Sequence, residues 1–359
     1  MKKAILITYP DKFAMDEALG LAEAADYEVA KLMTQKYLFR AKYGIGSGKA
    51  EELKKVSEEL DVDAILFDER LKSVQIYNLA KLTGLEVIDR ERLILEIFHK
   101  RASSAEAKLQ VQLAELRYEI PRAREKVRLA KAGEQPGFFG LGRYDVDDYH
   151  MMIRRRMVTI AKKLKRVGKR RELYKIQRLR TNLPLVSFAG YTGAGKTSLF
   201  NILTGEKKDT ERGFFTTLTT TTRSLQLSGY KALISDTVGF ISRLPTYMIE
   251  AFKATLEELT YANLVLLVID ASEPLQSMTI KYQSCVGILA ELGVSPLNVL
   301  AIFNKFDLTS KSEVEDKIRA LNMTLEDVII TSAKSDFGIE ALKSKIDAIV
   351  HVHVPNIPA

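Results

Sequence analysis

The sequence predicts an α/β fold in three parts: an N-terminal α/β domain, an antiparallel helical hairpin and a second α/β domain with a mainly parallel sheet. Two observations predict it. Short apolar runs alternate with helical patterns near both ends of the 359-residue chain, which is typical of parallel strands covered by helices. Between these regions the apolar period changes to that of two packed helices. We expect segments at residues 1–95, 96–181 and 182–350, and a tail at 351–359.

The N-terminal domain is predicted from two strand-like and three helix-like segments. Lys3–Thr8 and Val62–Phe67 are short apolar runs that we interpret as buried strands. Met15–Ala25, Gly48–Leu60 and Lys72–Leu82 have helical patterns. Because strands and helices alternate, a small domain with a mainly parallel sheet is expected.

The middle segment has two apolar seams that step by four and three residues, as in a helix pair. The residues from 133 to 142 between these seams are rich in glycine and include Pro136, so they cannot continue a helix. We therefore predict a helical hairpin with a glycine-rich tip. The seams consist of Leu109, Leu113, Leu116, Ile120, Ala123, Val127 and Ala130, and of Ile153, Met157, Ile160, Leu164 and Val167.

Composition limits the class of protein. The chain is 46% hydrophobic and 28% charged, which is typical of a soluble globular protein. Its longest apolar run, Leu264–Ile269, is too short to cross a membrane, and the N-terminus lacks the cleavage site of a secretory signal. A single cysteine, Cys285, excludes an internal disulfide and a cysteine metal cluster. We expect a cytoplasmic monomer without a membrane partner.

Positive charge is concentrated in the second arm of the hairpin. Residues 151–180 contain 13 Lys or Arg and one acid, Glu172. The net charge of this stretch is therefore +12, whereas that of the whole chain is +8. One acid cannot pair with 13 cations along a helix, so we favour contact with nucleic-acid phosphates over a merely solvated face. The candidate RNA-binding residues are Arg154, Arg155, Arg156, Lys162, Lys163, Lys165, Arg166, Lys169, Arg170 and Arg171.

A phosphate-binding loop opens the third segment. The buried strand Leu185–Ala189 runs into a glycine-rich loop, and a helix begins at Ser198. In this context glycines let backbone N–H groups surround a β-phosphate, while Lys196 reaches the β- and γ-phosphates. The candidate nucleotide-binding residues here are Gly190, Tyr191, Thr192, Gly193, Ala194, Gly195, Lys196, Thr197 and Ser198.

Three later elements identify the nucleotide as GTP. Asp236-x-x-Gly239 follows a strand, and Gly239 can offer its N–H to a γ-phosphate. Asn304-Lys305-x-Asp307 follows another strand, and the Asp307 carboxylate can accept both N1–H and the 2-amino group of guanine, which adenine lacks. A backbone N–H near Ser332, Ala333 and Lys334 can meet guanine O6. These elements predict a Ras-like P-loop GTPase domain that hydrolyses GTP to GDP.

Magnesium is the expected cofactor. We assign the metal to Thr197 and Asp236 and to a switch threonine, and spacing does not choose between Thr217 and Thr221 for that role. Lys196, Gly239 and the switch threonine are the candidate catalytic residues. Phe240 stands where Ras-like enzymes carry a water-orienting Gln, so slow intrinsic turnover is expected.

The whole chain resembles the HflX branch of the translation-factor-like GTPases. The matching motifs are Tyr43–Leu53, Leu109–Tyr118 with Pro121 and Arg122, Arg154–Arg156 and Asp236–Pro245. The resemblance implies a GTPase that binds the large ribosomal subunit, contacts ribosomal RNA through the hairpin and separates stalled ribosomes. It also implies a hydrophobic residue after Asp-x-x-Gly, as Phe240 is.

Two other functions stay open from the sequence. One is an RNA-remodelling protein that uses ATP in the N-terminal domain, where Gly44–Lys49 is either a phosphate-contacting loop or a tight helix-entry turn. The other is a signalling GTPase whose hairpin binds an acidic protein. Steep weakening with salt would separate phosphate binding from the latter.

Overall fold

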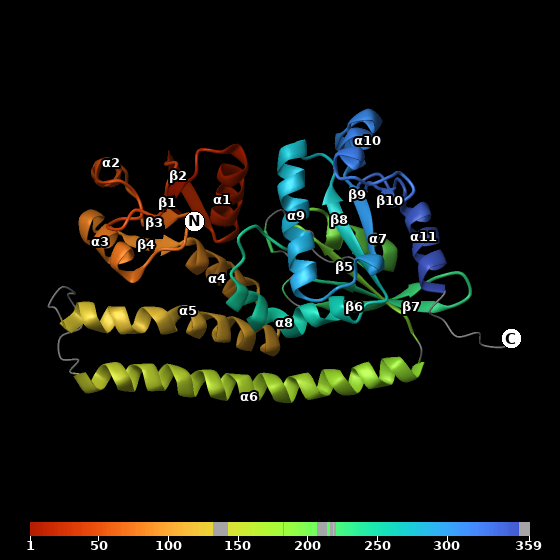
Figure 1. The fold of residues 1–359 in the computed structure, drawn as a ribbon, viewed down its shortest axis with the longest axis horizontal. Helices are drawn as coiled ribbons and strands as arrows, with labels where there is room; N and C mark the ends of the chain where they lie inside the picture. Colours follow the sequence, from red (N-terminus) through yellow and green to blue (C-terminus); the bar gives the residue numbers. More distant parts are fainter. Residues whose placement is uncertain (132–142, 182, 207–213, 216–217, 219, 352–359) are drawn as a thin grey trace. The chain divides into compact units, whose positions relative to one another are not determined.

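The computed structural model describes the chain except for residues 132–142, 182, 207–213, 216–217, 219 and 352–359. The chain forms two compact units, residues 1–166 and 167–359. Each unit has a sheet of mainly parallel strands accompanied by helices, so the predicted α/β fold class is confirmed (Figure 1). None of the helices in the described part of the chain is long and apolar enough to cross a membrane.

The first unit is built on a four-stranded parallel sheet in the order β2-β1-β3-β4. The central strands β1 and β3 are almost wholly buried, as short apolar runs between helices should be. Neither edge strand was predicted from the sequence: β2 has a partly exposed pattern, and β4 has only two apolar residues between two acids. The elements are β1 (Lys2–Thr8), α1 (Lys12–Ala24), β2 (Tyr27–Thr34), α2 (Ser47–Glu59), β3 (Ala64–Phe67), α3 (Ser73–Thr83), β4 (Glu86–Asp89) and α4 (Arg90–Arg101).

The predicted helical pair is present as α5 (Ala105–Lys131) and α6 (Arg143–Thr181), which run side by side in Figure 1. Buried Leu116, Ala123 and Ile153 form a small core between these helices, with Met157 and Ile160 packed against it. All five belong to the predicted seams. The predicted tip, residues 133–142, lies outside the described residues.

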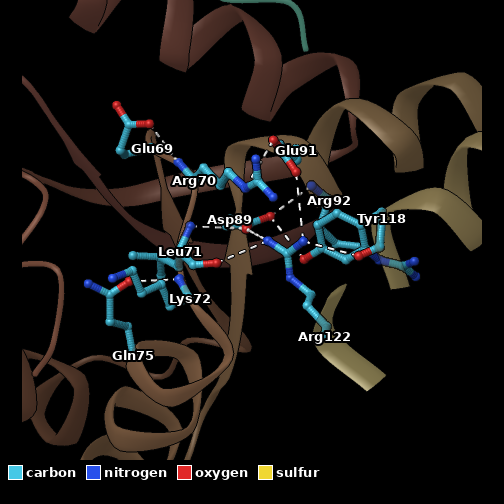
Figure 2. A network of polar contacts seen from close by, with 10 residues as sticks. All are labelled: Glu69, Arg70, Leu71, Lys72, Gln75, Asp89, Glu91, Arg92, Tyr118 and Arg122. Carbon is cyan, nitrogen blue, oxygen red and sulfur yellow. Dashed lines mark hydrogen bonds and ion pairs between the residues drawn. The ribbon is translucent and has the colours of Figure 1, made fainter. Parts of the chain in front are cut away.

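A buried polar network joins α5 to the sheet of the first unit (Figure 2). The Arg122 guanidinium donates to Asp89 Oδ2 at 2.7 Å and to the Leu71 carbonyl at 3.0 Å. It also lies 3.6 Å from the ring centroid of Tyr118, whose hydroxyl donates to Asp89 Oδ1 at 3.1 Å. The Asp89 side chain in addition accepts the Arg92 N–H and so caps α4. Thus Tyr118 and Arg122, two residues of the hairpin motif, hold the hairpin on its domain.

The second unit contains a six-stranded sheet in the order β10-β9-β8-β5-β7-β6, in which only the edge pair β6–β7 is antiparallel. Its apolar core includes Val186, Phe188, Phe200 and Ile302. The elements are β5 (Leu185–Gly190), α7 (Lys196–Thr204), β6 (Thr221–Gln226), β7 (Lys231–Asp236), α8 (Thr246–Thr260), β8 (Leu264–Asp270), α9 (Leu275–Glu291), β9 (Val299–Asn304), α10 (Lys311–Ala320), β10 (Val328–Ile330) and α11 (Ile339–His351), with 3-10 turns at Pro296–Asn298 and Phe306–Leu308.

Polar residues gather at one edge of this second sheet. Strands β5, β7, β8 and β9 are parallel and end at Gly190, Asp236, Asp270 and Asn304. The carboxyl ends of parallel strands lie at the same edge, which is where α/β sheets bind ligands. The sheet therefore brings residues from four distant motifs together.

Candidate active site

The phosphate loop turns tightly from β5 into α7. Gly190, Gly193 and Gly195 have φ values of 141°, 78° and 96°. A Cβ at Gly190 would lie 2.4 Å from the backbone oxygen of Val268, and one at Gly195 would lie 2.2 Å from Asn304 Nδ2. Only glycine fits both the dihedral angle and the space at these two positions. The loop leads into the N-terminus of α7, where backbone N–H groups favour an anion.

Lys196 is buried at the start of α7, with 6% of its surface exposed. Its Nζ donates to the carbonyl oxygens of Gly190 at 3.0 Å and Tyr191 at 2.8 Å. Burial lowers the pKa of this ammonium to about 8, although nearby Asp236 acts in the opposite direction. A phosphate at this position would supply the negative charge that favours the protonated form.

Thr197 and Asp236 meet beside the phosphate loop. Thr197 Oγ1 donates to Asp236 Oδ2 at 3.1 Å, and both side chains are buried. The two residues are 39 positions apart in the chain and are brought together because β5 pairs with β7. A hydroxyl and a carboxylate are oxygen ligands of the kind that Mg²⁺ prefers, so the donor set fits the expected cofactor.

The segment after Asp236 pairs directly with the phosphate loop. The Phe240 N–H donates to the Gly190 carbonyl at 3.0 Å, and the Thr192 N–H donates to the Phe240 carbonyl at 2.8 Å. A Cβ at Gly239 would lie 3.0 Å from Lys196 Nζ, so this glycine is beside the catalytic candidate. Phe240 itself is 1% exposed. Its buried apolar ring cannot orient a water molecule by hydrogen bonding.

Two side chains of the phosphate loop hold later segments of the chain, which sequence reasoning missed. The Tyr191 hydroxyl accepts the Ser242 N–H at 2.7 Å, and Thr192 Oγ1 accepts the Phe215 N–H at 2.9 Å. These partners are 51 and 23 residues away. Because no local spacing relates them, the sequence carried no signal for either contact.

The side-chain amide of Asn304, the first residue of the guanine motif, joins two loops. Its Nδ2 donates to the Ala194 carbonyl at 2.9 Å. Its Oδ1 accepts the Ala333 N–H at 3.1 Å and lies 3.3 Å from Thr331 Oγ1. The phosphate loop and the segment after β10 are therefore linked through one buried side chain.

Lys305 and Asp307 follow Asn304 at the end of β9. Lys305 has a left-handed backbone with φ of 66°, and its Nζ pairs with Asp270 Oδ2 at 2.6 Å. Asp307 is exposed and its Oδ1 accepts the Ser332 hydroxyl at 2.6 Å. Asp270 was not among the expected residues, although an acid directly after an apolar strand was the signal that could have identified it.

The remaining base-side residues are close to this group. Ser332 pairs with Phe337 through a backbone bridge, and the Phe306 and Phe337 rings stack with centroids 4.9 Å apart. Ser332 is fully buried and Lys334 is exposed. The structure thus brings the Asn304–Asp307 and Ser332–Lys334 segments to the same end of the sheet.

The structure describes one of the two candidate switch threonines. Thr221 begins β6 and is the pairing partner of Asp236 in the antiparallel β6–β7 ladder. Thr217 lies outside the described residues. The choice between them as magnesium ligand therefore stays a prediction.

The cations predicted to contact RNA lie on α6. Seven of these side chains are exposed to solvent, and the side chains of the other three, Lys169, Arg170 and Arg171, lie outside the described residues. No acid occurs between Asp148 and Glu172. The exposed members are Arg154, Arg155, Arg156, Lys162, Lys163, Lys165 and Arg166.

Three models of known families match consecutive parts of the chain. The model described as GTP-binding GTPase N-terminal matches residues 12–99, and that described as GTP-binding GTPase Middle Region matches residues 101–178. A model described as 50S ribosome-binding GTPase matches residues 185–305. The matches therefore span both units of the chain.

Curated relatives are similar over nearly the full length. The GTPase HflX of Methanocaldococcus jannaschii is 41% identical over 336 residues, covering 94% of this chain and 83% of that protein. The GTPase HflX of Thermococcus kodakarensis is 41% identical over 347 residues, covering 95% and 78%.

Solved structures of GTP-binding proteins are similar too. The complex of SsGBP with GDP is 28% identical, with a TM-score of 0.57 and coverage of 99% of this chain and 100% of that one. A GTP-binding protein of Sulfolobus solfataricus in complex with GDP is 29% identical, with a TM-score of 0.52 and coverage of 98% and 99%.

Proposed function

We propose that this chain acts on the large ribosomal subunit. The chain belongs to the HflX GTPase family and is a P-loop GTP hydrolase. In this role it separates or rescues stalled ribosomes. The hairpin contacts ribosomal RNA, while the second unit binds and hydrolyses GTP. The match to a model described as 50S ribosome-binding GTPase supports the choice of subunit.

The exposed cationic face of α6 is the observation that carries the proposal. Arg154, Arg155 and Arg156 are consecutive and exposed, and Lys162, Lys163, Lys165 and Arg166 continue the charge along the helix. A helix that only needed solubility would carry both signs of charge. A single-sign surface of this kind attracts phosphates and releases their counterions.

GTP recognition divides between the two ends of the site. Backbone N–H groups of the phosphate loop and the Lys196 ammonium hold the β- and γ-phosphates, and the Gly239 N–H meets the γ-phosphate. Asp307 accepts N1–H and the 2-amino group of guanine, with a backbone N–H near Ser332 and Ala333 at O6. Lys305, held by Asp270, covers the ring face.

Thr197, Asp236 and one of the switch threonines, Thr217 or Thr221, would hold Mg²⁺. The ion would neutralise negative charge on the β- and γ-phosphates. The 3.1 Å hydrogen bond from Thr197 Oγ1 to Asp236 Oδ2 supports this assignment because it brings a hydroxyl oxygen and a carboxylate oxygen together.

Hydrolysis should be slow until a partner completes the site. Phe240 is buried against the phosphate loop and provides no group to orient water. The missing group therefore comes from another part of the chain or from the ribosome.

The test is GTP hydrolysis with and without purified large ribosomal subunits, at low and at moderate salt. The proposal expects stimulation that weakens as salt increases. Arg154→Gln combined with Arg155→Gln should reduce stimulation without changing the intrinsic rate. A matched control is Lys311→Gln with Arg319→Gln on α10, where both cations are exposed and should not matter.

Absence of stimulation in the unmodified chain contradicts the ribosomal role and leaves the GTPase activity intact. Stimulation by an acidic protein instead would indicate the signalling alternative. ATP turnover that survives Lys196→Ala and Asp307→Asn would indicate the alternative that uses the N-terminal domain.

A further inference from the structure

The loop that joins β2 to α2 presents aromatic rings and cations on the surface of the first unit. Residues 35–46 contain three Lys or Arg and three aromatic residues but no acid. Tyr37 is 44% exposed and Phe39 is 69% exposed. Single exposed apolar residues are common on proteins, but two neighbouring rings within an acid-free segment are a distinct feature.

The structure holds this loop in a defined conformation. Leu38 and Ile45 anchor it in the core, with 0% and 1% exposure. Arg40 and Gly44 exchange backbone hydrogen bonds of 2.9 and 2.8 Å. A Cβ at Gly44 would lie 2.8 Å from side-chain atoms of Leu71 and Phe67, so the turn closes tightly onto the core. The exposed rings are therefore presented by a fixed scaffold.

Helix α3 supports the loop and extends its positive charge. Gln75 Nε2 donates to the Arg40 carbonyl at 2.8 Å, and Asn78 Nδ2 donates to the Lys42 carbonyl at 2.9 Å. Residues 70–85, which include α3, also contain no acid. Lys72, the N-cap of α3, and Lys81, in its last turn, are both exposed. The loop and the α3 segment thus both lack acidic residues, and two hydrogen bonds join them.

The cations of the loop lie near the rings rather than in ion pairs. Lys36 Nζ is 5.4 Å from the Tyr37 ring centroid, and Lys42 Nζ is 4.9 Å from that of Tyr43. Within the described part of the chain, none of Lys36, Arg40 and Lys42 forms a salt bridge. Aromatic rings and these three cations therefore lie at the same place.

We propose that this surface, defined as Lys36, Tyr37, Phe39, Arg40, Lys42 and Tyr43 and called the 36–43 platform, binds single-stranded RNA. Unpaired bases stack on Phe39 and Tyr37, and Lys36, Arg40 and Lys42 contact the adjacent phosphates. Exposed aromatic faces combined with cations are what single-stranded nucleic acid requires, and stacking tolerates any base. An acidic protein would use the cations but would leave the rings without a partner.

The inference extends the proposed RNA partner to a second surface, and so it rests on the proposed function for its biological context. It does not depend on the α6 cations or on the GTP site. The two surfaces differ in kind: α6 offers charge alone, whereas the 36–43 platform offers charge and stacking. Platform binding should accordingly distinguish unpaired from paired RNA.

The chain has no tryptophan, so Phe39→Trp introduces a single fluorescent reporter into the platform of the full-length protein. Titration with a single-stranded RNA oligonucleotide should quench its emission, because the indole stacks on a base. Duplex RNA and heparin, a polyanion without bases, should quench much less even where they bind. Equal quenching by duplex RNA or by heparin would overturn the proposal, as would no quenching by single-stranded RNA.

Two further variants separate stacking from charge. Phe39→Leu keeps an apolar side chain and should weaken oligonucleotide binding about tenfold, the scale of one lost base stack. Lys42→Gln should reduce the slope of log affinity against log salt by about 0.7, as expected for one phosphate contact on a single strand. Tyr261→Leu, an exposed aromatic in the second unit, is the control and should change neither.

Unchanged affinity in Phe39→Leu would also overturn the platform. Neither the fluorescence result nor the affinity result contradicts the ribosomal proposal, because that proposal is tested by subunit-stimulated GTP hydrolysis. Conversely, quenching by RNA together with absent ribosomal stimulation would retain the platform and reject the ribosomal role.

Discussion

The two parallel sheets of this protein use the same edge in opposite ways. In the first unit, the carboxyl ends of β1 and β3 carry Thr8 and the adjacent Asp68, and Asp68 accepts the Thr8 hydroxyl at 2.7 Å. Arg90 lies buried against Asp68 and Glu17 at 2.5 and 2.6 Å. In the second unit, the corresponding edge carries the phosphate loop. There the Lys196 ammonium donates hydrogen bonds to two backbone carbonyls.

The difference shows that the same edge of a parallel sheet can either anchor another part of the chain or bind a ligand. Guanidinium groups from the chain itself neutralise the carboxylates of the first edge: Arg90 at Asp68 and Arg122 at Asp89. That edge therefore stabilises the fold and anchors the hairpin. Among the described residues of the second unit, no carboxylate forms a salt bridge with the buried Lys196 ammonium, which favours binding of an external anion.

The largest expected effect is on base selectivity. Asp307→Asn should lower GTP affinity about ten-thousandfold, because a site built to pair with a polar substrate group strongly rejects a mismatch. Xanthosine triphosphate should bind well, since its 2-oxo group accepts a hydrogen bond from the new amide. Competition of both nucleotides against labelled GDP measures this effect. Undiminished GTP binding would contradict the assignment of Asp307, and the melting temperature without nucleotide should stay unchanged.

The opposite result is expected at the first edge. Arg122→Met should lower the free energy of unfolding by about 3–5 kcal/mol, because Asp89 stays buried without its guanidinium. GTP affinity should be unaffected. Chemical denaturation followed by circular dichroism measures the loss, and Arg154→Met, at an exposed arginine, should change stability by less than about 0.5 kcal/mol. Similar stability of both variants would show that the network does not hold the hairpin.

The third effect distinguishes the two buried cations by pH. Burial lowers the pKa of Lys196 to about 8; burial alone would also lower the pKa of Arg90, but Asp68 and Glu17 raise it above its usual value. Bound phosphate favours protonated Lys196, so GTP affinity should be full below pH 8 and fall about tenfold per pH unit above it.

Calorimetry from about pH 7 to about pH 9 measures this dependence, and proton uptake on binding should appear near the upper end. The Lys196→Arg variant is the control, because its guanidinium stays charged and its affinity should not vary over this range. A constant affinity in the unmodified chain would show that Lys196 keeps an ordinary pKa.

The smallest effect concerns the contact between the phosphate loop and the segment after Gly239. Tyr191→Phe removes the acceptor of the Ser242 N–H and should destabilise the protein by about 1 kcal/mol. Tyr37→Phe is the matched control, since this tyrosine is 44% exposed and its hydroxyl forms no hydrogen bond with any residue that the structure describes. Thermal denaturation compares the two variants. An equal response would mean that the Tyr191 contact adds nothing to stability.

Much of the fold followed from local patterns. Both central strands of the first sheet, the two hairpin seams and the strand–loop–helix of the phosphate site were predicted because burial imposes a period on neighbouring residues. Strand β2 was not predicted, since an edge strand alternates poorly in polarity. Strand β4 was not predicted because it has only two apolar residues between two acids, whereas the equally short β3 is wholly apolar. Helix ends shifted by one to three residues where capping decided them, as at Asp11 for α1.

The candidate site divides in the same way. By itself the sequence determined the phosphate loop, the Asp-x-x-Gly segment and the guanine motif, because each needs a few consecutive residues at a strand end. Only the tertiary structure showed that Asn304 links two loops and that Lys305 pairs with Asp270. It also showed that the Tyr191 hydroxyl accepts the Ser242 N–H. These partners lie tens of residues apart. Their contacts depend on which strands become neighbours in the sheet, and no local pattern encodes that order.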